Sequence, residues 1–135
     1  MITGVLMIAV TIWSEARSEG VNGMNLVAET IQNRARQKRK PPAMIVVEPG
    51  QYSCWSGAEA PAIAADPKYL LGPEAHAWGY SVHLARLVQA GKMRCRPGVM
   101  YYRDKSISEA RYLRLFSRPL VRVEEIGRLV AYKEA

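Results

Sequence analysis

The N-terminal part of the chain carries two apolar patterns, and both favour helices. Residues 5–13 are almost continuously apolar. A helix that is apolar all round must be buried, so we expect a core helix over about residues 3–17. Between residues 23 and 37, apolar side chains recur at helical spacing with polar ones between them. This pattern predicts a second, amphipathic helix with Asn22 as its N-cap.

The middle of the chain combines a clear helix with less regular segments. Residues 44–47 form a short apolar run, which predicts a buried strand. Residues 58–71 show no clean period, which predicts an irregular loop beside a functional cleft. Residues 73–90 predict a helix, because Pro73 suits the first helical position and Gly91 suits the position after the last turn.

The C-terminal part of the chain predicts a small antiparallel sheet. Residues 99–103 have the pattern of a strand, and residues 120–123 and 128–132 have that of the two arms of a hairpin. Ser106 and Glu109 have the spacing of a capping box, which predicts that a short helix begins there. With no internal repeat and no linker, these elements predict a helix-dominated α+β fold in a single domain.

Length, composition and charge agree with this prediction. The chain has 135 residues, enough for one ordinary domain over residues 1–135, and 49% of them are hydrophobic, as a packed core requires. The formal net charge of +7 favours anionic partners, such as nucleic acid, acidic membranes or the acidic polymers of a bacterial envelope. The basic run at residues 34–40 is more typical of a solvated helix end than of a nucleic-acid patch.

Two further features bear on targeting and on redox state. The apolar run at residues 5–13 is shorter than the ~20 residues of a bilayer span and has no basic segment before it, so no signal peptide is expected. Cys54 and Cys95 match no metal-binding spacing. They fit one disulfide or two reduced thiols, and the sequence leaves both alternatives open.

Several familiar catalytic motifs do not occur in the sequence. It contains no Gly-rich phosphate loop, no GxSxG and no HExxH. His76 and His83 fall on one predicted helix, but with no third ligand nearby in sequence they favour surface or packing roles over zinc binding. A nucleophilic pair of Cys54 with His83 is an equally weak alternative.

Glu15 is the strongest candidate for chemistry. It falls near the end of the apolar helix, with Ile8, Thr11 and Ile12 on its own face. Partial burial and the negative end of the helix dipole both favour its protonated form. Cleavage of a glycosidic bond requires such a group, because the leaving oxygen must receive a proton. The structural alternative is a carboxylate that ends the helix and pairs with a neighbouring arginine.

Five segments form a pattern that extends over nearly the whole chain. They are residues 12–20 (IWSEARSEG), 31–34 (IQNR), 46–55 (VVEPGQYSCW), 100–102 (MYY) and 126–132 (IGRLVAY). In order and spacing they resemble the motifs of the spore-cortex-lytic, or SleB-type, cell wall hydrolase family, and the third segment is the most specific. The chain departs from the family at residues 96–100 (RPGVM), where members carry a Gly-rich run and a Thr-His step.

The resemblance implies an enzyme that cleaves the glycan strands of peptidoglycan, with a core similar to lytic transglycosylases and the lysozyme superfamily. It implies that Glu15 is the catalytic residue, with Glu19 as a candidate second carboxylate. It requires neither a metal nor another cofactor. A groove would bind sugar rings through amides and aromatic faces. The residues expected in this groove are Asn33, Gln51, Tyr52, Trp55, Tyr101 and Tyr102.

The expected reaction is cleavage between N-acetylmuramic acid and N-acetylglucosamine. With one assigned carboxylate, we expect a lytic transglycosylase, in which Glu15 acts first as acid and then as base while the muramic 6-hydroxyl traps the intermediate. A muramidase, which hydrolyses the same bond, needs a second carboxylate such as Glu19 or Asp66. An N-acetylmuramoyl-L-alanine amidase and, more distantly, a basic nucleic-acid-binding protein are the alternatives from other classes.

The expected partners and location follow from the same resemblance. Peptidoglycan is the substrate and the anionic envelope surface attracts the basic chain, which we expect to be a monomer without specific nucleic acid. With neither a signal peptide nor a wall-binding module, the chain is similar to a phage or prophage endolysin. Such a protein is made in the cytoplasm of the bacterial host and acts on the cell wall after release.

Overall fold

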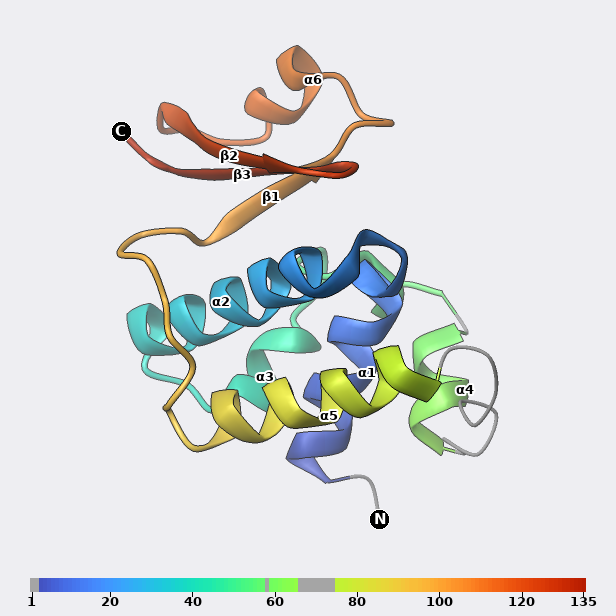
Figure 1. The fold of residues 1–135 in the computed structure, drawn as a ribbon. Helices are drawn as coiled ribbons and strands as arrows, with labels where there is room; N and C mark the ends of the chain where they lie inside the picture. Colours follow the sequence, from blue (N-terminus) through green and yellow to red (C-terminus); the bar gives the residue numbers. More distant parts are fainter. Residues whose placement is uncertain (1–2, 58, 66–74) are drawn as a thin grey trace.

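Two layers make up the structure: a group of helices and a small sheet that lies across one side of it (Figure 1). The computed structural model describes residues 3–57, 59–65 and 75–135. Over these ranges the fold is helix-dominated α+β, as the sequence predicts. No helix within them is long and apolar enough to cross a membrane.

Helices form most of the described elements. In chain order they are α1 (Gly4–Ala16), the 3-10 turn η1 (Arg17–Glu19), α2 (Gly20–Lys38), α3 (Pro42–Val46), the 3-10 turn η2 (Ser53–Trp55), α4 (Glu59–Ala65), α5 (Ala75–Gln89) and α6 (Glu109–Leu113). The strands are β1 (Tyr101–Asp104), β2 (Leu120–Ile126) and β3 (Leu129–Glu134). They are antiparallel in the order β1-β3-β2, so the predicted hairpin of the last two is confirmed.

Helix α1 packs against both α2 and α5 and forms the centre of the helical layer. Thr3 caps it by accepting a hydrogen bond from the backbone N–H of Leu6. Ile8 and Ile12 are fully buried. The apolar run therefore forms the expected core helix, and the last turn of this helix carries Glu15.

Helix α2 begins earlier than predicted, so the assignment of Asn22 as its N-cap is wrong. The first residue of the helix is Gly20, and Glu19 occupies the cap position. Gly20 has a φ of 72°, a conformation that glycine adopts without steric cost. This residue lets the chain turn directly from η1 into α2, a backbone feature that apolar periodicity does not report.

The two predictions for residues 44–47 and 58–71 are wrong where the structure describes them. A short helix, α3, replaces the predicted strand, with Pro42 at its first position and both Ile45 and Val46 fully buried. Four apolar residues in a row cannot distinguish a buried helix from a buried strand. Helix α4 occupies part of the predicted loop, whose remaining residues lie outside the described ranges.

Helix α5 ends as predicted, at a glycine in the left-handed conformation. Gly91 has a φ of 70°, and its N–H donates to the carbonyl of Val88 at 3.0 Å. The helix is described from Ala75 onward. Pro73, the predicted first residue, lies outside the described ranges.

Helix α6 follows β1, but its cap is not the predicted one. Ser108 is the N-cap, and its hydroxyl accepts a hydrogen bond from the backbone N–H of Arg111. Ser106 instead donates its backbone N–H to Oδ1 of Asp104 at 2.8 Å. The chain therefore makes a turn at the end of β1 before the helix begins, and the predicted capping box with Glu109 does not form.

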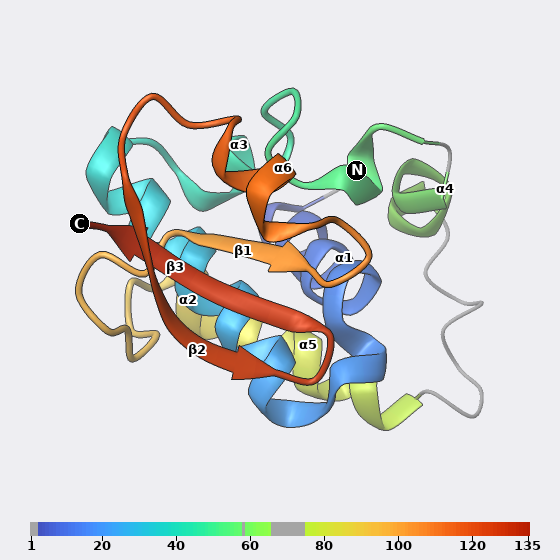
Figure 2. The ribbon, with the colours of Figure 1, turned by 90° about the horizontal axis from the view of Figure 1, so that it is seen from above.

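The sheet places its first strand beside the helical layer. Tyr102 of β1 pairs with Ala131 of β3, the central strand, and Ala131 is fully buried. Viewed from above, β1 is the sheet edge on the side of α3 and α6, and β2 is the far edge (Figure 2). The side chains of β1 thus come close to residues from α1, α2 and η2.

Candidate active site

A cleft of about 750 Å³ opens where the end of α1, the second half of α2 and the turn before η2 meet β1 and α6. Its polar lining comes from segments that are far apart in the sequence. Its lining includes Glu15, Arg34, Gln51, Ser53, Tyr101, Tyr102, Arg103 and Asp104.

The Glu15 carboxyl is half-buried in this cleft. The hydroxyl of Ser53 donates to its Oε2 atom at 3.4 Å. Burial raises the pKa of the Glu15 carboxyl, and interactions with Tyr102, Ser53 and the backbone of Cys54 only partly offset this effect. No lysine or arginine of the described residues forms an ion pair with it. The carboxyl therefore holds its proton to a higher pH than an ordinary glutamate does.

The hydroxyl of Tyr102 is buried close to this carboxyl. Burial and then the negative charge of Glu15 raise the pKa of Tyr102 well above its ordinary value, so the phenol keeps its proton. The hydroxyl lowers the pKa of Glu15, but it makes no well-formed hydrogen bond to any described residue. Buried donors without such a bond are rare in proteins, and this one belongs to a residue that lines the cleft.

Arg34 contributes a buried positive charge to the same cleft. It is only 7% exposed. Its Nε donates to the carbonyl of Met100 and its Nη1 donates to Oε1 of Gln51, both at 2.6 Å. The guanidinium carbon lies 5.1 Å from the ring centre of Tyr52 and 5.3 Å from that of Tyr101. The prediction that the basic run is a solvated helix end is therefore wrong at its first residue.

Four of the residues predicted from the sequence come together in the cleft. They are Glu15, Gln51, Tyr101 and Tyr102. The Tyr101 ring lies edge-on to Phe116, with ring centres 4.9 Å apart. These residues come from β1, the end of α1 and the turn before η2, and they line one cleft. Their spacing in the sequence alone does not indicate this arrangement.

Two further predicted residues, Asn33 and Glu19, do not line the cleft but support segments around it. The amide of Asn33 donates to the carbonyls of Arg96 at 2.8 Å and Val99 at 3.0 Å, which fixes the segment before β1. The carboxylate of Glu19 accepts from the backbone N–H of Arg128 at 2.9 Å, in the turn between β2 and β3. Glu19 is therefore placed to hold the sheet rather than to assist Glu15.

Tyr52 and Trp55 lie in the wall behind the cleft. Tyr52 is 2% exposed, and its hydroxyl shares a hydrogen bond of 3.1 Å with Thr30. The indole N–H of Trp55 donates to the hydroxyl of Thr11 at 2.8 Å. Both side chains pack in or against the hydrophobic core, and neither belongs to the lining of the cleft.

Sequence reasoning missed Ser53, Arg103 and Asp104 as lining residues. Asp104 accepts hydrogen bonds from the backbone N–H of Ser106 and from Arg128. Burial acts to raise the pKa of Asp104, but these interactions outweigh burial and lower it. Helical spacing could have identified Arg34, because it falls three residues after the buried Ile31 on the apolar side of α2. No signal in the sequence indicates Asp104.

The cysteine and histidine alternatives gain nothing from the structure. Burial raises the pKa of the Cys54 thiol to about 12, so at neutral pH it is not the thiolate that a nucleophile must be. Cys54 and Cys95 are free thiols. His76 and His83 are both exposed. No three histidine, cysteine or acidic side chains of the described residues come together as a metal site.

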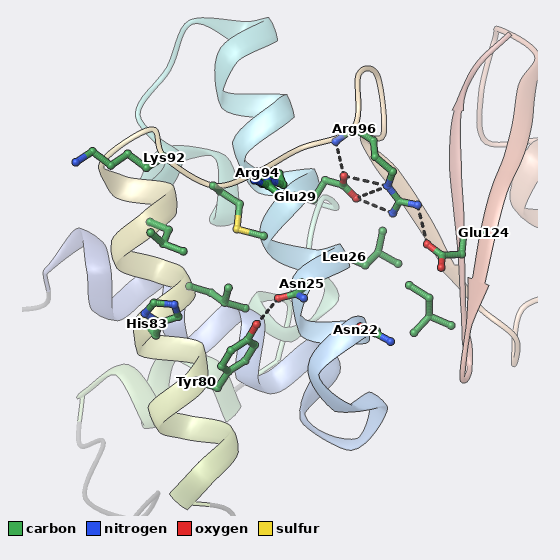
Figure 3. A pocket seen from close by; sticks show the side chains of 14 residues that line it. Asn22, Asn25, Leu26, Glu29, Tyr80, His83, Lys92, Arg94, Arg96 and Glu124 are labelled. Atoms are coloured by element: carbon green, nitrogen blue, oxygen red, sulfur yellow. Dashed lines mark hydrogen bonds and ion pairs between the residues drawn. The ribbon is translucent and has the colours of Figure 1, made fainter.

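A second pocket, of about 440 Å³, shares no lining residue with the first. It lies between α2, α5 and β2, and Figure 3 shows Glu29 and Arg96 directed at each other within it. Arg96 donates to Glu29 from its backbone and its guanidinium, with Nη2 2.8 Å from Oε1. Its Nη1 donates to Oε2 of Glu124 at 2.6 Å. In this pocket the buried carboxylate is neutralised by an arginine.

Comparisons of the chain with protein-family models, curated proteins and solved structures find no match. The five segments that resemble the family motifs in the sequence meet at the larger cleft. Each of them supplies at least one lining residue of the larger cleft: Glu15, Arg34, Gln51, Tyr102 and Leu129 in chain order.

Proposed function

We propose that the chain is a SleB-type cell wall hydrolase with a lysozyme-like arrangement, which cleaves the bond between N-acetylmuramic acid and N-acetylglucosamine in peptidoglycan. The observation that carries the proposal concerns Glu15: its carboxyl is half-buried in a cleft, its pKa is raised, and no cation of the described residues pairs with it. The meeting of all five family-like segments at this cleft is the second support.

Glu15 acts as the general acid in this proposal. Its carboxyl donates a proton to the glycosidic oxygen while positive charge develops at the anomeric carbon. Burial keeps the proton on the carboxyl at a pH where an exposed glutamate is ionised. Turnover should therefore fall as the pH rises through the raised pKa of Glu15, because only the protonated form donates.

The rest of the cleft fits a sugar chain. A volume of about 750 Å³ accommodates a ligand of several hundred daltons, such as a short segment of a glycan strand. Tyr101 offers a ring face for the C–H surface of a pyranose, and Gln51 and Ser53 offer groups that bond to hydroxyls. The protonated phenol of Tyr102 offers a donor close to Glu15.

The fate of the intermediate separates two versions of the reaction. With Glu15 as acid and then base, the muramic 6-hydroxyl attacks the anomeric carbon and the product is a 1,6-anhydro sugar. Hydrolysis requires a second carboxylate. The Glu19 carboxylate accepts a hydrogen bond from the turn between β2 and β3, and Asp66 lies outside the described residues. Asp104, in contrast, lines the cleft. We favour the transglycosylase, with a muramidase that uses Asp104 as the alternative.

Charge suggests how such an enzyme reaches its substrate. The net charge of +7 attracts the chain to the anionic bacterial envelope, and salt should weaken this attraction. We propose that the protein acts on the wall as an endolysin-like monomer after its release from the cytoplasm.

Mass spectrometry of the soluble products from purified peptidoglycan tests the proposal. The wild type should release muropeptides that end in 1,6-anhydro-N-acetylmuramic acid. Asp104→Asn should release the same products at a similar rate, because the transglycosylase does not use Asp104. Incubation with a metal chelator or a thiol reagent should leave the products unchanged.

Other products would change or end the proposal. Muropeptides with reducing ends from the wild type, and loss of activity in Asp104→Asn, would replace the transglycosylase by the muramidase. Free stem peptides would show that the enzyme is an amidase. The release of no fragment at all, from a folded protein, would contradict the proposed function itself.

A further inference from the structure

The guanidinium of Arg34 has more hydrogen-bond donors than the protein uses. A guanidinium carries five N–H groups. The Nε–H and one N–H on Nη1 donate to the carbonyl of Met100 and the side chain of Gln51. The remaining three, two of them on Nη2, meet no acceptor among the described residues.

The charge of Arg34 is also not neutralised. Both of its acceptors are uncharged, and no carboxylate of the described residues lies within ion-pair distance. Burying a guanidinium against neutral acceptors alone is costly. Arg96 shows the usual arrangement in the same molecule, because it pairs with both Glu29 and Glu124.

The surroundings of Arg34 hold the guanidinium rigidly on the cleft. Its central carbon lies near the rings of Tyr52 and Tyr101, and its hydrogen bonds to Met100 and Gln51 fix both Nε and Nη1. A guanidinium fixed in this way presents a planar, preorganised fork that matches the two oxygens of a carboxylate. If Arg34 served only to join α2 to the segment before β1, it would need neither its charge nor the N–H donors that meet no acceptor among the described residues.

We infer that Arg34 is a binding residue for a carboxylate of the glycan strand, so that the cleft selects strands carrying an anionic substituent next to the bond that is cut. This inference rests on the proposed function, since it concerns the substrate of the same cleft. Two groups of peptidoglycan supply the required chemistry: the lactyl carboxylate of muramic acid where no peptide is attached, and the carboxylates of an attached stem peptide.

The test compares the same glycan strands with and without their carboxylates. One pair consists of strands freed of peptide, with the lactyl groups either free or converted to methyl amides. The other pair consists of peptide-bearing strands, with the stem carboxylates either free or amidated. The wild type, Arg34→Gln, Arg34→Lys and the control Arg36→Gln are compared by kcat/KM, after thermal denaturation has shown which variants fold. Arg36 lies on the same helix, is exposed and does not line the cleft.

The wild type should cleave the charged member of one pair about ten- to one-hundredfold faster than its neutral partner, as expected for one charge-assisted contact. Arg34→Gln should lose this preference while its rate on neutral strands changes much less. Arg34→Lys should keep part of the preference and Arg36→Gln all of it. The pair that shows the preference identifies the lactyl or the stem-peptide carboxylate as the ligand.

Two results would overturn the inference, and they differ from failure of the proposed function. Equal rates of the wild type on charged and neutral strands would contradict it, and this result needs no variant to fold. An equal loss by Arg34→Gln on all four strands would show that Arg34 only supports the structure. If the wild type cleaves none of the strands, the proposed function itself is wrong.

Discussion

Glu15 and Glu29 are both glutamates on helices of the same layer, and each lines a pocket, but their carboxyl groups have different neighbours. Glu29 is 5% exposed and accepts several hydrogen bonds from Arg96. Glu15 is half-buried, has no cation paired with it among the described residues, and has its pKa raised by burial. The arginines differ in the same way: Arg96 pairs with two carboxylates, whereas the buried Arg34 pairs with none in the part of the chain that the structure describes.

The two sites differ in whether the protein itself supplies a partner for each charged group. In the Glu29 pocket the protein satisfies its own charges, so the ion pair joins α2 to the segment before the sheet. In the Glu15 cleft, the carboxyl of Glu15 and the guanidinium of Arg34 have no ion-pair partner among the described residues, and the phenol of Tyr102 makes no well-formed hydrogen bond to them. Burying such groups lowers the stability of the fold. Buried polar and charged groups without such partners are expected where a substrate supplies the missing hydrogen bonds.

The largest effect on stability should come from the paired site. Glu29→Gln removes the charge that Arg96 binds, and the loss of a charge-assisted network should lower the free energy of unfolding by about 2–3 kcal/mol. Urea denaturation at pH 7 measures this change. A variant as stable as the wild type would mean that the Glu29 pocket is not a structural ion-pair site.

The same substitution at Glu15 should raise the free energy of unfolding at pH 8 instead of lowering it. The folded state raises the pKa of Glu15, so the folded chain binds more protons than the unfolded chain between the ordinary and the raised pKa. Wild-type stability therefore falls as the pH rises through this interval. Glu15→Gln carries no titrating group there and should be more stable than the wild type at pH 8.

The pH dependence provides the control for this prediction. The stability difference between wild type and Glu15→Gln should shrink as the pH falls below the ordinary carboxyl pKa, where both side chains are neutral. Thermal unfolding from pH 3 to pH 8 measures it. A variant less stable than the wild type at pH 8 would indicate that the ionised Glu15 stabilises the fold, as in a structural pair.

Tyr52 lies behind the cleft and Tyr102 lines it, so replacing each with phenylalanine should have different effects on stability and on turnover. Tyr52→Phe removes a buried hydrogen bond to Thr30 and should cost about 1 kcal/mol with turnover preserved. Tyr102→Phe removes a hydroxyl that makes no well-formed hydrogen bond to any described residue, so the free energy of unfolding should change little. Turnover should fall about tenfold, the equivalent of one hydrogen bond to the substrate or to Glu15. The reverse pattern would exchange the roles of the two residues.

The smallest effect should come from Cys54. The pKa of its thiol is raised to about 12, so it supplies no thiolate at neutral pH. Cys54→Ala should keep kcat within about twofold of the wild type, as expected when no nucleophile is removed. A loss of all activity in a folded variant would restore the cysteine–histidine alternative.

The sequence predicts the long elements well and the composition of the cleft only in part. Apolar periodicity identifies α1, α2, α5 and the hairpin, because each has a long or repeated pattern. It fails at α3, where a few apolar residues fit helix and strand equally, and at Gly20, where a single backbone angle decides where α2 begins. Local patterns do not report which distant segments meet.

The same limit applies to the individual site residues. Glu15 is identifiable because an acid at the end of an apolar helix is unusual, and the motif resemblance adds Gln51 and the two tyrosines. The burial of Arg34 is hidden within a basic run, and Asp104 lies in the cleft only because β1 ends there. Contacts between segments more than sixty residues apart, such as those of Arg34 with Met100, decide these positions.

The most direct measurement is the rate at which wild type, Glu15→Gln and Glu29→Gln release soluble glycan fragments from purified peptidoglycan, at a temperature where all three are folded. Loss of a general acid should slow Glu15→Gln by about 10²- to 10⁴-fold. Glu29→Gln should match the wild type, although it is the less stable protein. Fragment release by Glu15→Gln at the wild-type rate would contradict the account.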